Sequence, residues 1–435
     1  MRVFRWVVFA LVMAMTIAAC GSEEPTDTES GTETTVDAGT DTTSAESPDT
    51  TMVESTDTTA GAEASGEPLL IGMILVGPQN DRGWSQAHYE ALQYVVERTG
   101  APEPIVIDTV NPSDRPDTTV EQVVDDMVEQ GAQLIFATSD DMKDGILAAA
   151  AAHPDVPMIW SSGDSAWEEG EAYAGLDNLG NVMGEMEYGK MIAGCAAALK
   201  TETGSIGYVG PLINDETRRL VNAAYLGARH CYENRGEDPA ALQFEVSWIG
   251  FWFNIPGVTL DPTQVTNDLL DNGADVIISG IDTTEAIVRV GQRFAADEAV
   301  WAVPYDYEGA CDEAPAACLG VPYFNWGPSY LEIANSVSDG SFTATWEWLE
   351  PDWSDINNED TSPVGFVKGE GLGDAEADLD AFIAELAGGT NLWSGPLNFQ
   401  DGSTFLADGE EATDQQIWYM PQLLEGIEGA SVAEE

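Results

Sequence analysis

Carboxylate and aromatic side chains follow short apolar runs at several places in this chain, and they are the residues best suited to ligand chemistry. An indole or phenyl ring can stack on a flat molecule, and a carboxylate accepts hydrogen bonds from N–H and O–H groups. Only the first of these segments contains an Arg, and only Lys143 lies close to another, so an anion would fit poorly. We therefore predict a planar ligand with N–H and O–H donors. The predicted contacts are Asn80, Asp81, Trp84, Ser139, Asp140, Trp252, Phe253, Asp282, Asp306 and Trp326.

Two of these residues also have an ordinary structural interpretation. Segment 77–84 is a polar turn that leads into a predicted helix. There Asp81 could cap the helix and Trp84 could anchor the core; the residue types give these roles the same weight as ligand binding. Three aromatic residues stand together at 251–253, just past a predicted strand. Because core packing can use one or two of them, we expect one to face the ligand.

The elements that must position these residues alternate along the chain. Apolar runs of strand length alternate with helical patterns from residue 69 onward, which favours right-handed βαβ units and a mostly parallel sheet. The first series predicts strands at 69–76, 105–108, 134–138 and 157–160, with helices at 85–98, 119–130 and 143–152. The second series predicts helices at 181–199, 215–232, 262–272 and 283–294, with strands at 205–209, 243–248, 276–279 and 300–304.

Two such series in succession predict an α/β fold with two doubly wound lobes. Loops at the carboxyl ends of the strands would then line a cleft between the lobes. We place lobe 1 at 68–175, with a return segment at about 322–350, and lobe 2 at 176–321. We expect the C-terminal segment, 351–435, to complete the lobes.

The N-terminal residues predict export. Arg2 and Arg5 precede an apolar stretch that is too short to favour a permanent membrane span. Small residues then precede Cys20, a pattern that resembles a lipobox, so we predict a signal peptide at 1–19 and a lipid anchor on Cys20. An ordinary signal peptide with an incidental cysteine is the alternative. Residues 20–67 contain no Lys or Arg and almost no large apolar residues, which predicts an acidic, disordered stalk.

The chain is strongly acidic, with 77 Asp and Glu against 15 Lys and Arg and a net charge of −62. This charge repels nucleic acid and anionic lipid, so we expect no nucleic-acid partner and no membrane attachment except the lipid. It also indicates a salty environment, where screening makes the charge tolerable.

Four cysteines remain besides Cys20, and an even number in an exported chain favours disulfides. Three pairings are possible; we favour Cys195–Cys231 and Cys311–Cys318 because they are the more local closures. No two cysteines have the CxxC spacing and the chain has only 3 His. We therefore predict no metal site and no cofactor.

In their order, several segments resemble the basic membrane protein (BMP) family of solute-binding lipoproteins. Residues 77–84, with His88, resemble the opening block GP-x-x-D-x-GW-x-x-x-H. Further blocks are similar at 204–228, 246–253, 280–282, 306 and 326–330, and 393–402 resembles the closing strand. The resemblance covers most of residues 69–402, and it is the ordered series that is specific.

The resemblance implies a type I periplasmic-binding fold, with hinge crossings between the lobes and a ligand held between them. It implies docking to an ABC permease on the extracytoplasmic face of the membrane, and a purine base or nucleoside as the ligand. Carried over, Trp84, Trp326 and either Trp252 or Phe253 would contact the ring, and the predicted aspartates would supply acceptors. The chain departs from the family at Asn325, near a Lys of the nucleoside-binding branch, and at Asn254 and Asp140-Asp141. The first departure argues against assuming that ribose is recognised, and Asp140-Asp141 predicts a more polar cleft floor. A hydrophilic base analogue or another small amide or amine stays open as the ligand.

Three other function classes fit the sequence less well. A surface nucleoside hydrolase is disfavoured because the sequence has no Gly-x-Ser-x-Gly elbow and no Ser–His–Asp set in a plausible order. We therefore predict that the chain is not an enzyme. A sensor lipoprotein that reports its ligand to a membrane receptor stays open as an alternative, and an adhesin fits a two-lobe plan less well. We expect a monomer.

Overall fold

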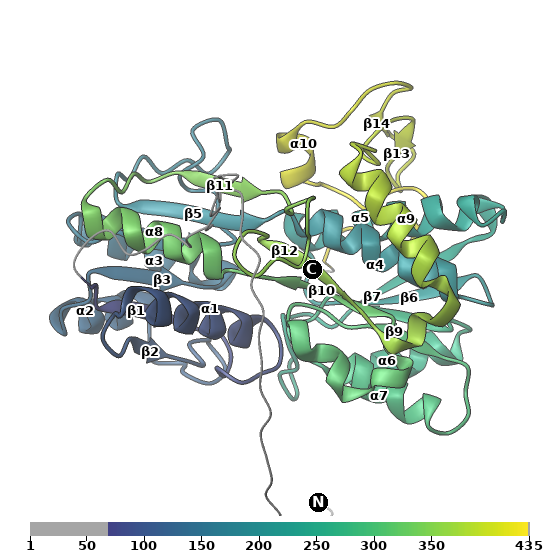
Figure 1. Ribbon diagram of the computed structural model, residues 1–435, viewed down its shortest axis with the longest axis horizontal. Helices are drawn as coiled ribbons and strands as arrows, with labels where there is room; N and C mark the ends of the chain where they lie inside the picture. The colour runs from purple at the N-terminus through teal and green to yellow at the C-terminus, as the bar shows by residue number, and fades with distance from the viewer. Residues whose placement is uncertain (1–67, 434–435) are drawn as a thin grey trace, which may run out of the picture. The chain divides into compact units, whose positions relative to one another are not determined.

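The computed structural model describes residues 68–433, which form two α/β lobes (Figure 1). The predicted signal peptide at 1–19, the lipidated Cys20 and the stalk at 20–67 lie outside the described residues. Among the residues that are described, no helix is both long enough and apolar enough to cross a membrane.

The first lobe is built on a six-stranded sheet in which every neighbouring pair of strands runs parallel. The strand order is β11-β5-β4-β3-β1-β2. Strands β1, β3, β4 and β5 are buried along their whole length, as expected for parallel strands that are covered on both faces. The bounds are β1 (Ile71–Ile74), β2 (Ile105–Ile107), β3 (Leu134–Ala137), β4 (Met158–Ser161), β5 (Leu179–Gly184) and β11 (Trp346–Leu349).

Four helices cover this sheet, with α1 packed beside α8 and α2 packed beside α3. A reciprocal capping box between Thr119 and Gln122 starts α2. The helix α1 ends at a left-handed Gly100, the usual device for stopping a helix. The bounds are α1 (Trp84–Thr99), α2 (Val120–Glu129), α3 (Lys143–Ala152) and α8 (Gly327–Asp339).

The sequence prediction is wrong at the start of the second series. We expected a helix from residue 181, but Leu179–Gly184 forms β5 and the helix α4 (Met186–Lys200) begins only afterwards. The reason is tertiary: β5 lies between β4 and β11 and pairs with both in parallel. The first sheet therefore extends past residue 175, where we had placed the end of lobe 1.

The second lobe is built on a five-stranded sheet of order β15-β7-β6-β8-β9, again parallel throughout. Helices α4 and α5 pack against each other, as do α6 and α7, and α9 packs on α4. The strands are β6 (Ser205–Gly210), β7 (Gln243–Trp248), β8 (Val276–Ser279), β9 (Trp301–Val303) and β15 (Ile427–Glu428). The helices are α5 (Asp215–Asn234), α6 (Pro262–Asp271), α7 (Glu285–Phe294) and α9 (Glu376–Ala387).

The chain passes between the lobes three times. It crosses from β5 into α4, from β10 (Gly320–Phe324) into α8, and from β11 into β12 (Val364–Lys368). Strands β10 and β12 pair in an antiparallel ribbon, which lies between the two lobes in Figure 1. Such multiple crossings provide a hinge about which the lobes can open and close.

The C-terminal segment packs on both lobes. Trp418, at the end of α10 (Asp414–Trp418), belongs to the hydrophobic core of the first lobe. Met420 and Leu424 belong to that of the second. Strand β15 then joins the second sheet beside β7, and a short hairpin of β13 (Leu397–Asn398) and β14 (Thr404–Leu406) precedes α10.

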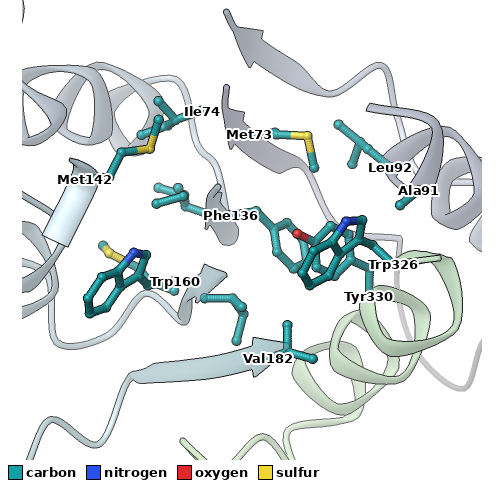
Figure 2. Close-up of a cluster of buried hydrophobic side chains, with 14 of the residues drawn as sticks. Met73, Ile74, Ala91, Leu92, Phe136, Met142, Trp160, Val182, Trp326 and Tyr330 are labelled. Carbon is teal, nitrogen blue, oxygen red and sulfur yellow. The ribbon is translucent and has the colours of Figure 1, made fainter. Parts of the chain in front are cut away.

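The core of the first lobe extends to the crossing helix α8. Figure 2 shows Trp326 and Tyr330 near α8, among side chains that include Phe136 of β3 and Leu92 of α1. Tyr330 stacks on Phe136 with ring centroids 4.0 Å apart, and its hydroxyl hydrogen bonds to Ser161 at 2.8 Å. Because α8 is anchored in this way, it belongs to the first lobe although it follows the second in sequence.

Two disulfides join cysteines that are 36 and 7 residues apart in the chain. Cys195 of α4 pairs with Cys231 of α5, and Cys311 pairs with Cys318. The first cross-links the two helices whose packing forms much of the second lobe's core. The second closes a short loop between β9 and β10.

Candidate functional site

A cavity lies between the two lobes. The first lobe contributes the side chains that follow β1, β3 and β4, and the second lobe those at or beyond β6 to β9. All of these positions are at the carboxyl ends of parallel strands, where α/β sheets place their ligands. The lining residues are Trp84, Ser139, Asp140, Ser162, Tyr208, Pro211, Glu216, Thr217, Leu220, Trp252, Gly280, Asp282 and Tyr305.

Trp84 serves the core and the cavity at once. Its indole N–H donates to the carbonyl oxygen of Thr138 at 2.6 Å, and its ring meets Trp326 edge-on at a centroid distance of 5.5 Å. The residue is 7% exposed, and the cavity borders it. The two interpretations that the sequence left open for Trp84 are therefore compatible: the core holds the ring rigidly, and one part of it faces the cavity.

Asp81 has the structural role that its residue type suggested, because its side chain caps the start of α1. One carboxylate oxygen accepts from the backbone N–H groups of Gly83 and Gln86, and the other from that of Ser85, at 2.9 to 3.0 Å. It therefore satisfies free N–H groups at the start of α1. Burial raises the pKa of Asp81, and these hydrogen bonds oppose the rise. Asp81 is outside the cavity lining.

Trp252 and Asp282 enter the cavity from neighbouring loops of the second lobe. The backbone N–H of Asp282 donates to the carbonyl oxygen of Trp252 at 3.0 Å, which fixes the two loops together. Within residues 68–433, the buried indole nitrogen of Trp252 has no acceptor at full hydrogen-bond distance, although it lies near enough to Asp141 to lower the pKa of that carboxyl group. Burial raises the pKa of Asp282 well above its usual value, and the nearby charges of Asp306 and Asp81 add to the rise. Burial has therefore already removed water from the carboxyl group of Asp282, and a ligand with N–H donors can hydrogen bond to it there.

Behind this wall lies a buried Lys190 of α4. Its ammonium donates to the carbonyl oxygen of Ser279 at 2.7 Å and lies 3.2 Å from the ring centroid of Tyr305. Burial lowers its pKa well below the usual value, and Asp306 opposes the change. Asp306 is itself fully buried, at a φ of 69°, and neither of its carboxylate oxygens has a partner at full hydrogen-bond distance in the described part of the chain, although Tyr305 lies near enough to lower its pKa. Burial raises the pKa of Asp306, and Lys190 lowers it.

The structure leaves several predicted contacts outside the cavity lining. Asn80 is exposed on the loop before α1, and Asp306 lies next to Tyr305 but is not part of the lining. Phe253 meets Phe251 edge-on and packs against the first lobe's core. Trp326 is 3% exposed and stacks on His88 at 4.3 Å, behind Trp84.

The predicted contacts that do line the cavity are Trp84, Ser139, Asp140, Trp252 and Asp282. Their contact with a ligand stays a prediction. Burial raises the pKa of Asp140, whereas the nearby Lys143 lowers it. The neighbouring Asp141 is outside the lining, and burial and the charge of Asp140 raise its pKa to about 6.

Sequence reasoning missed the side chains that follow β6, and it missed Tyr305, which stands next to the predicted contact Asp306 after β9. Glu216, Thr217 and Leu220 come from the first turns of α5, just beyond β6, and Tyr305 comes directly after β9. The rule that ligands bind beyond the carboxyl ends of strands applies to them as well. The signal was therefore present in the sequence, because 211–220 and residue 305 both follow predicted strands.

The two lobes touch at the rim of the cavity. The guanidinium of Arg82, in the first lobe, lies 3.0 Å from the carboxylate of Glu313 and donates to the carbonyl oxygen of Gly309 at 3.2 Å. Beside it the backbone of Gly83 approaches Asp282 so closely that a Cβ atom on Gly83 would lie 1.6 Å from the carbonyl oxygen of Asp282. The structure therefore has the lobes closed over the cavity.

The site offers no group for bound-metal chemistry in the described residues. Nowhere in 68–433 do three or more His, Cys, Asp or Glu side chains gather in a way that could hold a metal ion. The arrangement is that of a binding site, with aromatic rings and carboxyl groups from two lobes around one cavity.

Solved structures of solute-binding proteins share this fold. One from Aeropyrum pernix has a TM-score of 0.58 at 12% identity and covers 76% of this chain and 93% of its own. One from Conexibacter woesei has a TM-score of 0.53 at 18% identity and covers 74% of this chain and 97% of its own. At these identities the likeness shows the periplasmic-binding fold alone.

Relatives by sequence extend over nearly the whole chain. A purine-binding protein of Brucella abortus is 27% identical over 377 residues, 85% of this chain and 95% of the relative. A protein of Haloferax volcanii that is provisionally named an ABC transporter glucose-binding protein is 28% identical over 384 residues, 85% and 83% of the two chains. The family model described as "ABC transporter substrate-binding protein PnrA-like" matches residues 69–342. The ordered blocks, the two-lobe fold with its cavity and this match together show that the chain belongs to the BMP family of ABC transporter substrate-binding proteins.

Proposed function

We propose that the chain captures a purine, as a base or a nucleoside, between its two lobes and delivers it to the permease of an ABC importer. Membership of the family establishes the coarser part: an extracytoplasmic substrate-binding protein, not an enzyme, with a small-molecule ligand and a permease partner. The purine assignment is supported by the similarity to the Brucella abortus protein and by the chemistry of the cavity.

The observation that carries the proposal is the composition of the lining. Four aromatic residues and three carboxylic acids border the cavity, and it contains no Lys or Arg. Aromatic faces suit a flat, polarisable ring system, and carboxyl groups suit its N–H donors. The aromatic residues are Trp84, Tyr208, Trp252 and Tyr305, and the acids are Asp140, Glu216 and Asp282.

A hexose is the second candidate, since the Haloferax volcanii relative is similar to the same degree. A hexose carries hydroxyl groups around its whole ring, and each loses free energy if it is buried without a partner. In this cavity aromatic rings, Pro211 and Leu220 make up about half of the lining residues. A flat base needs polar partners only along its edges, so the lining favours the purine.

The ligand class is tested by a thermal-shift screen of the purified protein in high salt against purine bases, nucleosides, glucose and a general solute panel. A bound ligand raises the melting temperature by mass action. We expect adenine, hypoxanthine or a nucleoside to give the largest shift. A shift with glucose and none with any purine would contradict the purine assignment and leave the fold and family intact.

Both lobes should contribute to the affinity that this screen detects. Replacing Trp84 or Trp252 with alanine removes one aromatic face, worth about 1–3 kcal/mol, or about 5- to 150-fold in Kd. Titration calorimetry measures each loss. Trp353, half-buried in an edge contact with Tyr188 and outside the cavity, gives the matched control Trp353→Ala. If Trp252→Ala bound as well as the wild type while Trp84→Ala did not bind, a ligand shared between the lobes would be excluded.

We also propose that the protein is held at the membrane by a lipid on Cys20, as a monomer. The support is the lipobox-like sequence before this cysteine. In cells, Cys20→Ala should abolish labelling by a fatty-acid analogue and release the protein from the membrane fraction. Retention of label in the variant would show that the attachment is elsewhere.

Purine uptake by cells distinguishes transport from the sensor alternative. If the protein serves an importer, deletion of its gene should abolish purine uptake.

A further inference from the structure

The carboxylate of Glu216 borders the cavity without a partner in the protein. Glu216 is the second residue of α5. Asn214 and Thr217 cap this helix reciprocally, each accepting from the backbone N–H of the other, so Glu216 is free of that task. In the described part of the chain, no hydrogen bond or ion pair reaches its side chain. Glu216 is half-buried, and its carboxyl group keeps hydrogen-bonding capacity that a ligand in the cavity can use.

The charges around Glu216 come from its own helix, from α4 and from the opposite lobe. Burial raises the pKa of Glu216 to about 7. Arg219, one turn further along α5, and Lys190 of α4 lower it, whereas Asp140 across the cavity and Glu187 of α4 raise it. Both protonation states are therefore populated near neutral pH.

The remaining groups that face Glu216 shift toward their neutral forms. Burial is the main cause of the raised pKa values of Asp282 and Asp306, and the charge of Glu216 contributes to both. The pKa values of Tyr208 and Tyr305 rise for the same two reasons. Since none of these groups is a cation, they do not form an ion pair with Glu216 in place of a ligand.

We propose that Glu216 reads the edge of the bound base, holding 6-aminopurines in its protonated form and guanine-type bases as a carboxylate. The inference rests on the proposed function, because it assumes that a purine occupies the cavity. It goes further by assigning the choice between bases to one residue that the sequence did not single out.

Adenine and guanine differ in the donors and acceptors along their edges. Adenine presents its 6-amino donor beside a ring-nitrogen acceptor, and such a nitrogen lies on each side of the amino group in the plane of the base. A protonated carboxyl group is complementary to that pair: its O–H donates to the ring nitrogen, and its carbonyl oxygen accepts from the amino group. Guanine instead presents two adjacent donors, N1–H and the 2-amino group, which an ionised carboxylate accepts in parallel. Each base therefore selects a different protonation state.

The test is the pH dependence of binding, measured by equilibrium dialysis of radiolabelled adenine and guanine between pH 6 and pH 8. Binding that requires the protonated acid should weaken for adenine by about tenfold over this window. Binding of guanine, which requires the carboxylate, should strengthen by about the same factor. Calorimetry in buffers of different ionisation enthalpy gives a second readout: near pH 7, adenine binding should take up about half a proton.

Two variants make the assignment specific. A Gln side chain is a permanent donor–acceptor pair, so Glu216→Gln should keep adenine affinity, lose its pH dependence, and bind guanine weakly at every pH. The matched control is Asp215→Asn, the adjacent helix residue, which pairs with Arg218 outside the cavity and should keep both wild-type slopes. Melting temperatures show whether each variant is folded.

The outcomes separate this inference from the proposed function. The inference is supported if adenine affinity falls with pH and guanine affinity rises in the wild type, and if both pH dependences flatten in Glu216→Gln. Flat or parallel slopes, or slopes that persist in Glu216→Gln, overturn it while leaving purine binding intact. If neither base binds at any pH, this inference is overturned, and the proposed function falls with it only if the thermal-shift screen finds no purine nucleoside that binds.

Discussion

Replacing Gly83 with alanine should weaken purine binding by about 100-fold or more, equivalent to about 2.7 kcal/mol, without lowering the melting temperature of the ligand-free protein. The physical reason is the contact at the rim of the cavity. A Cβ on Gly83 would lie 1.6 Å from the carbonyl oxygen of Asp282 and 2.6 Å from its carbonyl carbon. Both atoms are backbone and cannot rotate aside, so the lobes must stay apart.

The two measurements distinguish loss of closure from loss of folding. Open lobes cannot place Trp84 and Trp252 on the same ligand, so binding energy shared between them is lost. Calorimetry gives the affinity, and thermal unfolding without ligand gives the stability. Gln79→Ala, an exposed substitution in the same loop, is the matched control and should behave as the wild type. Wild-type affinity in Gly83→Ala would show that ligand binding does not need the lobe contact seen here.

Replacing Arg219 with methionine should destabilise the protein by about 3–5 kcal/mol, because it leaves a buried carboxylate unpaired. Arg219 of α5 and Glu187 of α4 are only 2% and 4% exposed, and their nearest charged atoms are 2.5 Å apart. The guanidinium also lies 4.3 Å from the ring centroid of Trp418 and donates to the carbonyl oxygen of that residue at 3.3 Å. This one side chain therefore joins both main helices of the second lobe to the C-terminal segment. Urea unfolding measures the loss.

The double variant Arg219→Met with Glu187→Gln is the informative companion. If the destabilisation comes from the stranded charge of Glu187, neutralising that charge should recover much of it. Calorimetric unfolding of the wild type, the two single variants and the double variant completes a double-mutant cycle and gives the interaction energy between Arg219 and Glu187. Equal stability of Arg219→Met and the double variant would show instead that the contacts with Trp418 account for the effect.

The fold was predictable because its elements are short and strongly patterned. The strand around Ile71–Ile74 and the helix around Asp215–Asn234 lie close to their predicted positions, since the parallel strands are continuous apolar runs and the helices have polar faces. Segment Leu179–Gly184 failed because Val182 and Met183 stand close to the apolar residues of α4, with only Gly184 and Glu185 before the helix begins. Periodicity alone cannot separate a buried strand from a buried helix, and only pairing with β4 and β11 decides it.

The site was predictable at the level of strand ends but not of side-chain direction. Placing candidates after strands selected Trp252 and Asp282, which do line the cavity. The same logic selected Trp326, which packs behind Trp84 against His88 instead, because the residue type does not say which face of a loop it occupies. Glu216 was missed since it stands in the first turn of a helix, where a glutamate is an ordinary surface residue.

The most direct test of the account is a crystal structure of the protein grown with adenine. We predict one adenine between the lobes, in contact with the rings of Trp84 and Trp252, with its amino edge within hydrogen-bond distance of Glu216 or Asp282. The lobes should be closed, with Gly83 against Asp282 as seen here. Adenine bound outside this cavity, or closed lobes with an empty cavity at saturating adenine, would contradict the account.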